Sequence, residues 1–486
     1  MYTNFTFPWI TLTILLLLSM AVLVWNLAST DRARKCAIAG MSLSLTLMVV
    51  ALCEVSLSQS HQLFEPLGLI GVKSWFSIDT LNAIPITLFT ALALGLTIFA
   101  PKRKLTPYWL SGMLLLTAST LTAYAANNMA ILVVGWAGST VPFLVKKFFS
   151  LSGEKEIPSL SRIALIGSVV SLLVAVLCIV FDSLDTKQIL SFSVHSGNSP
   201  LLHWAFGFLI VSVFLRKGLL PVHSWVISAY ERGPLLPLTL LVNSHLGAFL
   251  VARLASPLLP DVAHKALPIL GEIGLITAAY TAILALAERQ PRKLLGLLSI
   301  SQASFILVGL ESNNPDAIVG AFVHWQVVAV ATTILAAVYT SIEARLSSST
   351  FDGEGFLGLA ASTPRLAVFF AIGGLALVGV PLTLGFCAED LLLHGTLVTH
   401  PHLGIVLPIV TALNAFHVVR LFARLFLGQP KIDTTAVVDA LARERWVLTA
   451  ALLFLIIGGI FPAPLVRLPT ATAKKLVSTV TFQDRK

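Results

Sequence analysis

Charge is scarce in this sequence: of its 486 residues only 11% are Asp, Glu, Lys or Arg, against about 25% in a typical soluble protein. Apolar residues make up 56% of the chain, and the mean hydropathy is +0.89. A soluble fold cannot hide that much apolar surface from water. We therefore expect most of the chain to lie in lipid, where the size rules for soluble domains do not apply.

Cysteine is also scarce, and its spacing excludes the usual metal motifs. The four cysteines are far apart, lie in or near apolar segments and form no CxxC pair; they are Cys36, Cys53, Cys178 and Cys387. We interpret them as small packing residues rather than as ligands of zinc or of an iron–sulfur cluster. The sequence predicts no metal site, no bound cofactor and no catalytic residue set in this chain.

Long hydrophilic segments are missing as well. The largest polar stretches, near 183–201 and 345–365, are too short for a nucleotide-binding domain, and the P-loop pattern GxxxxGK[ST] is absent. The chain is therefore not expected to hydrolyse ATP or to hold NADH itself. Nothing in it predicts a nucleic-acid partner.

What the sequence has instead is a series of apolar runs of the length that a helix needs to cross a bilayer, about 20 residues. We predict about fourteen such spans and an all-α polytopic membrane protein. The predicted spans are 8–28, 37–57, 80–100, 107–126, 129–148, 163–182, 202–228, 235–256, 266–287, 294–311, 316–341, 366–394, 403–427 and 446–466.

Two of these spans contain helix-breaking residues. The seventh, 202–228, carries Gly218 and Pro221, and the twelfth, 366–394, carries Pro381. Proline removes a backbone hydrogen bond and bends or breaks a helix, and in a membrane such breaks persist where they are buried in protein or line a wet cavity. Paired broken spans in the two halves of a chain are typical of a transport site.

The two broken spans hold the same place in two blocks of five spans. The seventh is fourth among spans four to eight, and the twelfth is fourth among spans nine to thirteen. Because five is odd, the second block starts on the opposite side of the membrane, as in an inverted repeat. We predict four parts: a three-helix segment at 1–105, five-helix repeats at 106–256 and 257–430, and the last helix with a basic tail at 431–486.

The cations predict how the chain is oriented. Most of the 32 Lys and Arg residues fall in alternate loops once the N-terminus is placed outside. Since Lys and Arg accumulate in cytoplasmic loops, this pattern predicts both termini outside in a cell inner membrane. The basic tail after 467 is an exception, which we interpret as a segment lying against lipid or a partner subunit.

Ionisable groups also occur inside the predicted spans, where a charge at the bilayer centre costs from about 3 to more than 10 kcal/mol. The candidates for a proton path are Arg216, Lys217, His245, His324 and Glu389, with His223, Gln302, Asp390 and His417 as supporting residues. Such groups usually face the bundle interior, where they contact a partner or water. Histidine accepts and donates protons near neutral pH, so this pattern predicts a line of groups that moves protons.

Structural explanations stay open for each of these candidates. Arg216 and Lys217, about 100° apart around a helix, could extend to the membrane surface. His245 and His324 could be packed, hydrogen-bonded histidines that never titrate. A purely structural role is least favoured for Glu389, which follows a proline break and has apolar residues on both sides.

Several stretches resemble the antiporter-like membrane subunits. The most specific are RKGLLPVHSWVISAYERGPLLPLTLL (216–241) and GVPLTLGFCAEDLLLHG (379–395), at the two broken spans. Weaker ones are SWFSIDTLNAIPITLF with Asp79, RQPRKLLGLLSISQASFILVGL and GAFVHWQVVAVATTIL, so that the resemblance covers roughly 75–430. The family includes proton-pumping subunits of respiratory complex I, Mrp-type sodium/proton antiporters, hydrogenase-linked relatives and the B subunit of the DAB-type energy-coupled inorganic carbon pump.

The resemblance implies a fourteen-helix fold with two inverted five-helix repeats and a central line of ionisable residues that moves protons. Carried over residue by residue, Arg216 stands at the usual lysine position of span seven and His245 at the lysine position of span eight. His324 matches the span eleven histidine, and Glu389 matches the ionisable position of span twelve.

Two departures from the family pattern change what the resemblance implies. Span five usually carries a buried Glu that pairs with the span seven cation, and here that position is Ala137. Arg216 replaces a lysine, and because arginine does not lose its proton in proteins, it can fix a charge but not relay a proton. The pattern of an Arg before Pro-x-His-x-Trp resembles that of the carbon pump B subunits. This resemblance implies a subunit that conducts protons for a zinc-bearing peripheral partner.

Three functions therefore stay open. The favoured one is a proton-conducting subunit of an inorganic carbon pump that works with a hetero-oligomeric partner. The second is an antiporter-like subunit of a complex I-type NADH:quinone oxidoreductase or of an Mrp-type antiporter, where the chain would count as part of a translocase. The third is a membrane scaffold whose ionisable groups are relics.

Overall fold

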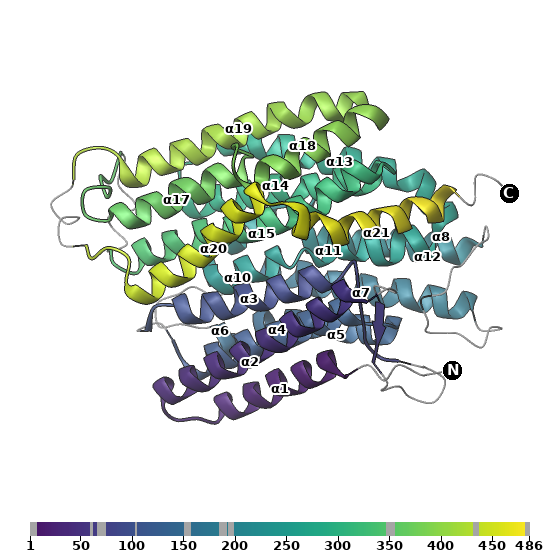
Figure 1. The fold of residues 1–486 in the computed structure, drawn as a ribbon, viewed down its shortest axis with the longest axis horizontal. Coiled ribbons are helices and arrows are strands. Elements are labelled where there is room, and N and C mark those ends of the chain that lie inside the picture. Colours follow the sequence, from purple (N-terminus) through teal and green to yellow (C-terminus); the bar gives the residue numbers. More distant parts are fainter. Residues whose placement is uncertain are drawn as a thin grey trace.

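The structure is a computed structural model that describes residues 7–58, 62–65, 74–102, 105–149, 157–183, 192, 199–346, 355–430 and 437–481. It is a bundle of helices, most of which run along the long axis of the molecule (Figure 1). Eight helices in these ranges are each long and apolar enough to cross a bilayer. The prediction of an all-α polytopic membrane protein is confirmed.

The N-terminal half contains α1 (Trp9–Trp25), α2 (Thr30–Leu57), β1 (Gln62–Phe64), β2 (Ser77–Asp79), α3 (Ala83–Phe99), α4 (Pro107–Ala125), α5 (Met129–Leu144), α6 (Lys146–Phe149), α7 (Ser159–Asp182), α8 (Pro200–Lys217), α9 (Ser224–Arg232), α10 (Leu235–Asn243), α11 (Leu246–Leu250), the π-helix η2 (Val251–Ala255) and α12 (Ser256–Leu258). The C-terminal half contains α13 (Pro260–Ala287), α14 (Pro291–Glu311), α15 (Pro315–Glu343), α17 (Pro364–Leu377), α18 (Leu384–Thr399), α19 (Pro401–Phe426), α20 (Ala442–Ile460) and α21 (Ala463–Thr481).

Local sequence explains where many of these helices begin. Proline suits the first turn of a helix, because its fixed φ is already helical and its missing N–H would have no partner there. Accordingly α13, α14 and α15 start at Pro260, Pro291 and Pro315. Asn314 adds a side-chain cap, since its oxygen accepts the backbone N–H groups of Asp316 and Ala317.

Each predicted span coincides with one helix or with helices separated by a short break, and two features differ from the prediction. The eighth span, predicted as a continuous helix over 235–256, is divided into α10, α11 and η2, with the break at His245. The sequence also gave no sign of the small antiparallel pair of β1 and β2 in the α2–α3 connection.

The centre of the bundle consists of the divided span and the two long helices that follow α13. In the most apolar part of each helix, all residues of α14 and α15 are buried, and 94% of those in Leu235–Ala255 are buried. In α2 the buried share is only 33%. Small residues allow close packing at this centre: the Cα of Gly320 in α15 faces the backbone of Ala388 and Leu392 in α18. The buried centre therefore holds three of the predicted site residues, His245, Gln302 and His324.

An ion pair joins the N-terminal segment to the divided span. Arg253 in η2 contacts Asp79 at the end of β2 with an Nη1–Oδ2 distance of 2.5 Å. Both side chains are mostly buried, with exposed fractions of 14% and 10%. Asp79 also accepts the backbone N–H groups of Leu81 and Asn82, which starts the turn into α3.

Removing the carboxylate of this pair should destabilise the fold. Asp79→Ala leaves Arg253 buried without its counter-charge, which typically costs about 3–5 kcal/mol. Arg365→Ala is the matched control, since Arg365 is 59% exposed and lies 4.0 Å from Asp439, so its loss should cost less than about 1 kcal/mol. The free energy of unfolding of each purified variant is measured in detergent. Equal losses of stability in the two variants would contradict a structural role for the Asp79–Arg253 ion pair.

The basic C-terminal segment folds as a helix. α21 follows α20 at a bend of 71°, and Thr472 in α21 donates a hydrogen bond to Thr80 beside β2. Figure 1 shows α21 lying across α15 and the neighbouring helices, and it ends at the right side of the view. The last cations of the predicted tail, in 482–486, lie outside the described residues.

Candidate functional site

The first predicted break is present between α8 and α9. α8 ends at Gly218, whose φ of +68° is the left-handed conformation that favours glycine. The chain then passes Pro221, and α9 starts after His223. The freed N–H of Leu220 donates to the hydroxyl of Thr277 in α13 at 3.1 Å. The break thus places the two cations of α8, Arg216 and Lys217, at a helix end inside the bundle.

Arg216 points toward α5. Its Nη2 donates to the hydroxyl of Ser139 at 2.7 Å, and its guanidinium lies over the ring of Trp136 at 5.3 Å. Both contacts come from the helix that carries Ala137, so a hydroxyl and an aromatic face stand where the resemblance leads one to expect a carboxylate. Arg216 is buried, and we assign it a fixed positive charge.

Lys217 points in a different direction, toward the divided span. Its aliphatic stem lies on Gly247 of α11, where a Cβ would come within 2.7 Å of the lysine Cγ. Gly247 is two residues from His245, so Lys217 lies beside the break in the divided span. Its Nζ is buried and has no hydrogen-bond partner among the described residues.

His245 occupies the break in the divided span. Its φ of +45° is left-handed, which is unusual for a residue with a Cβ. Its neighbours hold the break in place: Asn243 donates to the carbonyl of Ala329 at 2.9 Å, and Tyr124 donates to the carbonyl of Ser244. The interruption is therefore held by hydrogen bonds to α4 and α15.

The conformation of His245 makes a testable prediction. His245→Gly and His245→Ala both remove the imidazole, but alanine keeps the left-handed strain, which costs roughly 1–2 kcal/mol. We expect the glycine variant to be more stable than the alanine variant by about 1 kcal/mol, and proton transport to be lost in both. Thermal unfolding in detergent compares the stability of the two variants. An alanine variant as stable as the glycine variant would contradict a strained left-handed backbone at His245.

His324 lies at the centre of α15. Its Nε2 is 3.0 Å from the backbone carbonyl of Gln302 in α14, to which it donates in that tautomer, and its ring packs against Phe305 at 5.7 Å. The ring of His245 contacts Trp325, the residue next to His324, edge-on at 5.7 Å. The two histidines therefore line the same part of the buried centre.

Lys217, His245, His324 and Gln302 together form what we term the polar seam. Within the described ranges, the Nζ of Lys217, the Nε2 of His245, the Nδ1 of His324 and the side-chain amide of Gln302 are buried without hydrogen-bond partners. Buried polar groups are almost always satisfied by protein or water. The polar seam therefore requires water, and titratable groups joined by water can pass protons.

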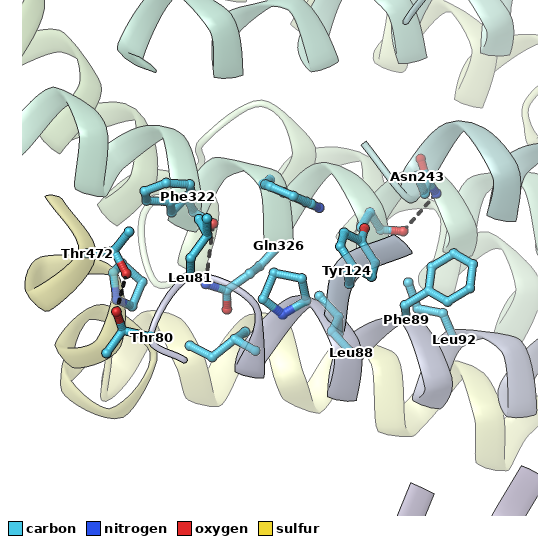
Figure 2. A pocket seen from close by; sticks show the side chains of 15 residues that line it. Thr80, Leu81, Leu88, Phe89, Leu92, Tyr124, Asn243, Phe322, Gln326 and Thr472 are labelled. Carbon is cyan, nitrogen blue, oxygen red and sulfur yellow. Dashed lines mark hydrogen bonds between the residues drawn. The ribbon is translucent and has the colours of Figure 1, made fainter. Parts of the chain in front are cut away.

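A small cavity lies beside the polar seam, between α3, α4, α10, α15 and α21. It has a volume of about 20 Å³, which is room for one water molecule. Figure 2 shows Gln326, Tyr124 and Asn243 around it, with the Thr472–Thr80 hydrogen bond at its α21 side. Gln326 donates to the carbonyl of Phe322 at 3.3 Å, and its own oxygen lacks a partner in the part of the chain that the structure describes.

The second predicted break separates α17 from α18. Gly379 there has a φ of +67°, and a Cβ at this position would meet the carboxyl group of Glu389. Pro381 follows, and Glu389 lies in the second turn of α18. One oxygen of Glu389 is buried without a hydrogen-bond partner among the residues described. Glycine thus leaves space for a buried carboxyl group at this break.

The structure does not bring every predicted residue to the polar seam. Across the described ranges no hydrogen bond, ion pair or ring contact joins Glu389 to the seam. The side chain of Asp390 is 53% exposed and lies 3.4 Å from His394. His417 contacts the carbonyl of Ala282 at 2.7 Å, and His223 packs against Tyr280 at 5.1 Å.

Other residues of the site were not predicted from the sequence. Ser139 and Trp136 contact Arg216, and the hydroxyl of Tyr124 donates to the carbonyl of Ser244 at the break in the divided span. Hydroxyl and aromatic residues are so common in membrane helices that no local pattern distinguishes these three. Among the described residues no group of three or more His, Cys, Asp and Glu side chains is arranged to hold a metal ion.

Comparison with known sequences gives one family. The family model described as NADH:quinone oxidoreductase/Mrp antiporter, TM matches residues 126–414. NADH-quinone oxidoreductase subunit N of Parafrankia sp. (strain EAN1pec) is 28% identical over 280 residues, which is 57% of this chain and 53% of that protein. NADH-quinone oxidoreductase subunit M of Rickettsia bellii (strain RML369-C) is 23% identical over 373 residues, 74% of either chain. The match to subunit N thus spans about half the length of that relative.

Solved structures share the fold over almost the whole chain. A chain of respiratory complex I from Thermus thermophilus has a TM-score of 0.86 at 22% identity, covering 97% of this chain and 99% of that one. A chain of the Mrp complex from Dietzia sp. DQ12-45-1b has a TM-score of 0.83 at 16% identity, covering 97% and 98%. At these identities the likeness concerns the fold.

Proposed function

Because the chain belongs to the NADH:quinone oxidoreductase/Mrp antiporter family, we propose that it is a proton-conducting, antiporter-like subunit of a multi-subunit membrane complex. The polar seam is the observation that carries this proposal. It puts a lysine and two histidines in the buried centre of a membrane protein, next to two interrupted helices, with hydrogen-bonding capacity left for water. Ionisable groups are costly in that setting, and where they occur they usually mark an ion or proton pathway.

Within this function, Lys217 is the titratable amine and Arg216 the fixed charge. Arginine keeps its proton, while a buried lysine changes its protonation state readily. A proton that arrives at Lys217 passes through water to His245 and His324. The positive charge of Arg216 is held by Ser139 and Trp136 of α5.

The finer proposal is that the chain is the B subunit of an inorganic carbon pump. It is supported by Ala137 and by Arg216, which has a hydroxyl rather than a carboxylate as its partner. A lysine–carboxylate pair is the element that the resemblance links to redox-driven pumping. Without that pair, the chain would conduct protons down their gradient and a zinc-bearing peripheral partner would use the energy.

The second candidate is an antiporter-like subunit of a complex I-type or Mrp-type assembly. It is favoured by the names of the relatives, which are subunits N and M of NADH-quinone oxidoreductase. In that assembly the driving reaction would occur in other subunits, and the same polar seam would carry the protons.

Purification of the tagged chain from native membranes in mild detergent separates these functions. A co-purifying soluble protein that contains zinc supports the carbon pump, and co-purifying quinone-oxidoreductase or Mrp subunits support the second candidate. Proton flux into sealed vesicles that contain the purified complex is measured in parallel. A chain that purifies alone, and whose vesicles are no more permeable to protons than empty ones, would overturn the proposal.

The scaffold alternative makes an opposite prediction for buried groups. If the ionisable residues are relics, His324→Ala leaves growth and proton flux unchanged at equal protein level. We expect a loss of at least about tenfold, since a positioned proton-transfer group contributes about 10²–10⁴-fold. Protein level in the membrane is measured by immunoblot, so that a folding defect is not mistaken for lost transport.

A further inference from the structure

A second cavity lies at the end of the bundle where α14 ends and α15 begins. Its volume is about 180 Å³, and because one water molecule needs about 10–15 Å³, it has room for several. Its wall includes Val251 of η2, Glu311 of α14, Ile318 of α15 and His400 at the α18–α19 junction. None of these residues is part of the polar seam.

Glu311 is the unusual member of this wall. Its side chain is 0% exposed, and neither of its carboxyl oxygens has a hydrogen-bond partner among the described residues. The Nδ1 of His400 lies 3.4 Å from its Oε1, and His400 is 30% exposed. A buried carboxylate without hydrogen bonds is costly, so this group favours a bound proton, a water molecule or a cation.

The neighbouring helix is shaped to admit this carboxyl group. Gly271 of α13 faces it, and a Cβ at that position would lie 2.6 Å from the Cδ of Glu311. Only glycine leaves the space in which the carboxyl group lies. The pocket for Glu311 is therefore formed by two helices and the α18–α19 junction rather than by chance exposure of a helix end.

The cavity lies on the same elements as the polar seam, nearer to the end of the bundle. Glu311 lies two and a half turns beyond Gln302 on α14, a rise of ~13.5 Å that puts the two side chains on opposite faces of the helix, and Ile318 lies about 9 Å along α15 from His324. Val251 similarly follows His245 along the divided span, at the start of the π-helix. Spanning the rise of ~13.5 Å from Gln302 to Glu311 would take a chain of about four hydrogen-bonded waters, each about 2.8 Å from the next.

We propose that Glu311 and His400 form a proton-binding port between the polar seam and the membrane face at which α14 ends. The sequence analysis predicts this to be the outer face. The inference rests on the proposed function and adds to it a site where protons enter or leave. A proton taken from water binds Nδ1 of His400 or Oε1 of Glu311, passes between these atoms, and leaves to water in the cavity.

Other titratable groups lie around the port. Glu272 of α13 interacts electrostatically with Glu311 and contacts His402 of α19 at 2.6 Å. His264 of α13 also lines the cavity. The port thus groups acidic and imidazole side chains, of which His402 is 61% exposed, a composition suited to exchanging protons with the bulk.

Carbodiimide labelling tests the port without requiring transport. Carbodiimides modify protonated carboxyl groups, and mass spectrometry locates the product. In sealed vesicles of the full complex, we expect a membrane-impermeant carbodiimide to modify Glu311 from the predicted outer face only, increasingly as the pH is lowered. Glu311→Gln removes the modified peptide. Absence of modification from either face would overturn the port, as would protection by excess Na⁺ at constant pH, which would indicate a metal cation.

Proton flux through variants of the complex is the second test of the port. We expect Glu311→Gln to lower proton flux about tenfold or more, and Glu311→Asp to keep part of the flux. Asp316 is an exposed acid at the same end of the bundle and serves as the control. We expect the flux of Asp316→Asn to stay within about twofold of the parent. If Glu311→Gln conducts like the parent while Lys217→Met does not, the port is wrong and the proposed function stands. If the parent itself does not conduct, the proposed function fails and the port as a transport element fails with it, even where Glu311 is labelled.

Discussion

Lys217→Met is expected to abolish proton flux through the complex, with a loss of about 100-fold or more. Methionine keeps an unbranched stem that can lie on Gly247 but removes the charge and the titratable amine. A 100-fold loss corresponds to about 2.7 kcal/mol, since each tenfold step is about 1.36 kcal/mol. The measurement is pH-dependent dye quenching in sealed vesicles that contain equal amounts of the parent or variant complex.

Two arginine–lysine exchanges are the controls for this result. Lys217→Arg keeps the charge but cannot release its proton, so flux should be lost nearly as completely as in the methionine variant. Arg216→Lys keeps a cation that can still donate to Ser139, but a buried lysine can release its proton, so flux should fall, by less than in Lys217→Arg. Near-normal flux in Lys217→Met would remove Lys217 from the path.

Glu389→Gln is expected to lower proton flux by about 10²-fold, in the range found for positioned proton-transfer groups. Glutamine has the same shape and fits the space beside Gly379, so folding should be preserved. The neighbouring residue offers a matched control, because Asp390 is exposed and pairs only with His394 among the described residues. Asp390→Asn should therefore change flux by less than about twofold.

The contrast between these adjacent carboxyl groups decides the role of the second broken span. Equal losses in both variants would indicate an effect on α18 as a whole rather than on a proton site. No loss in either would leave Glu389 as a structural carboxyl group and confine the proton path to the polar seam. Protein level and the unfolding temperature in detergent are measured for each variant, so that flux is compared at equal amounts of folded protein.

The sequence predicted the features that depend on composition and on single residues. Apolar runs of sufficient length predicted the helices, because lipid leaves a chain few other ways to satisfy its backbone. Gly218, Pro221 and Pro381 predicted the two breaks, since their backbone preferences act locally. The structure has both breaks at these residues.

Features that depend on the rotation and packing of helices could not be predicted. Arg216 and Lys217 are adjacent, and only the orientation of α8 decides that the first faces Ser139 and the second faces Gly247. The break at His245 contains no glycine or proline and is held by hydrogen bonds to Ala329 and Tyr124, which lie far from it in the sequence. No local sequence pattern predicts such a break in a helix.

Glu311 was overlooked for a similar reason. An acidic residue at the end of an apolar run usually marks the membrane surface, and nothing local indicates that it is covered. Its burial results from Gly271 of α13 and from His400, which lie far from it in the sequence. The prediction of two inverted repeats, by contrast, remains a prediction.

The account depends on water in the polar seam, and a high-resolution cryo-EM map of the native complex tests this most directly. We expect ordered water within hydrogen-bonding distance of Lys217 Nζ, His245 Nε2 and His324 Nδ1, linking the three groups. A dry seam closed by apolar side chains, or a Lys217 side chain that extends to the membrane surface, would contradict it.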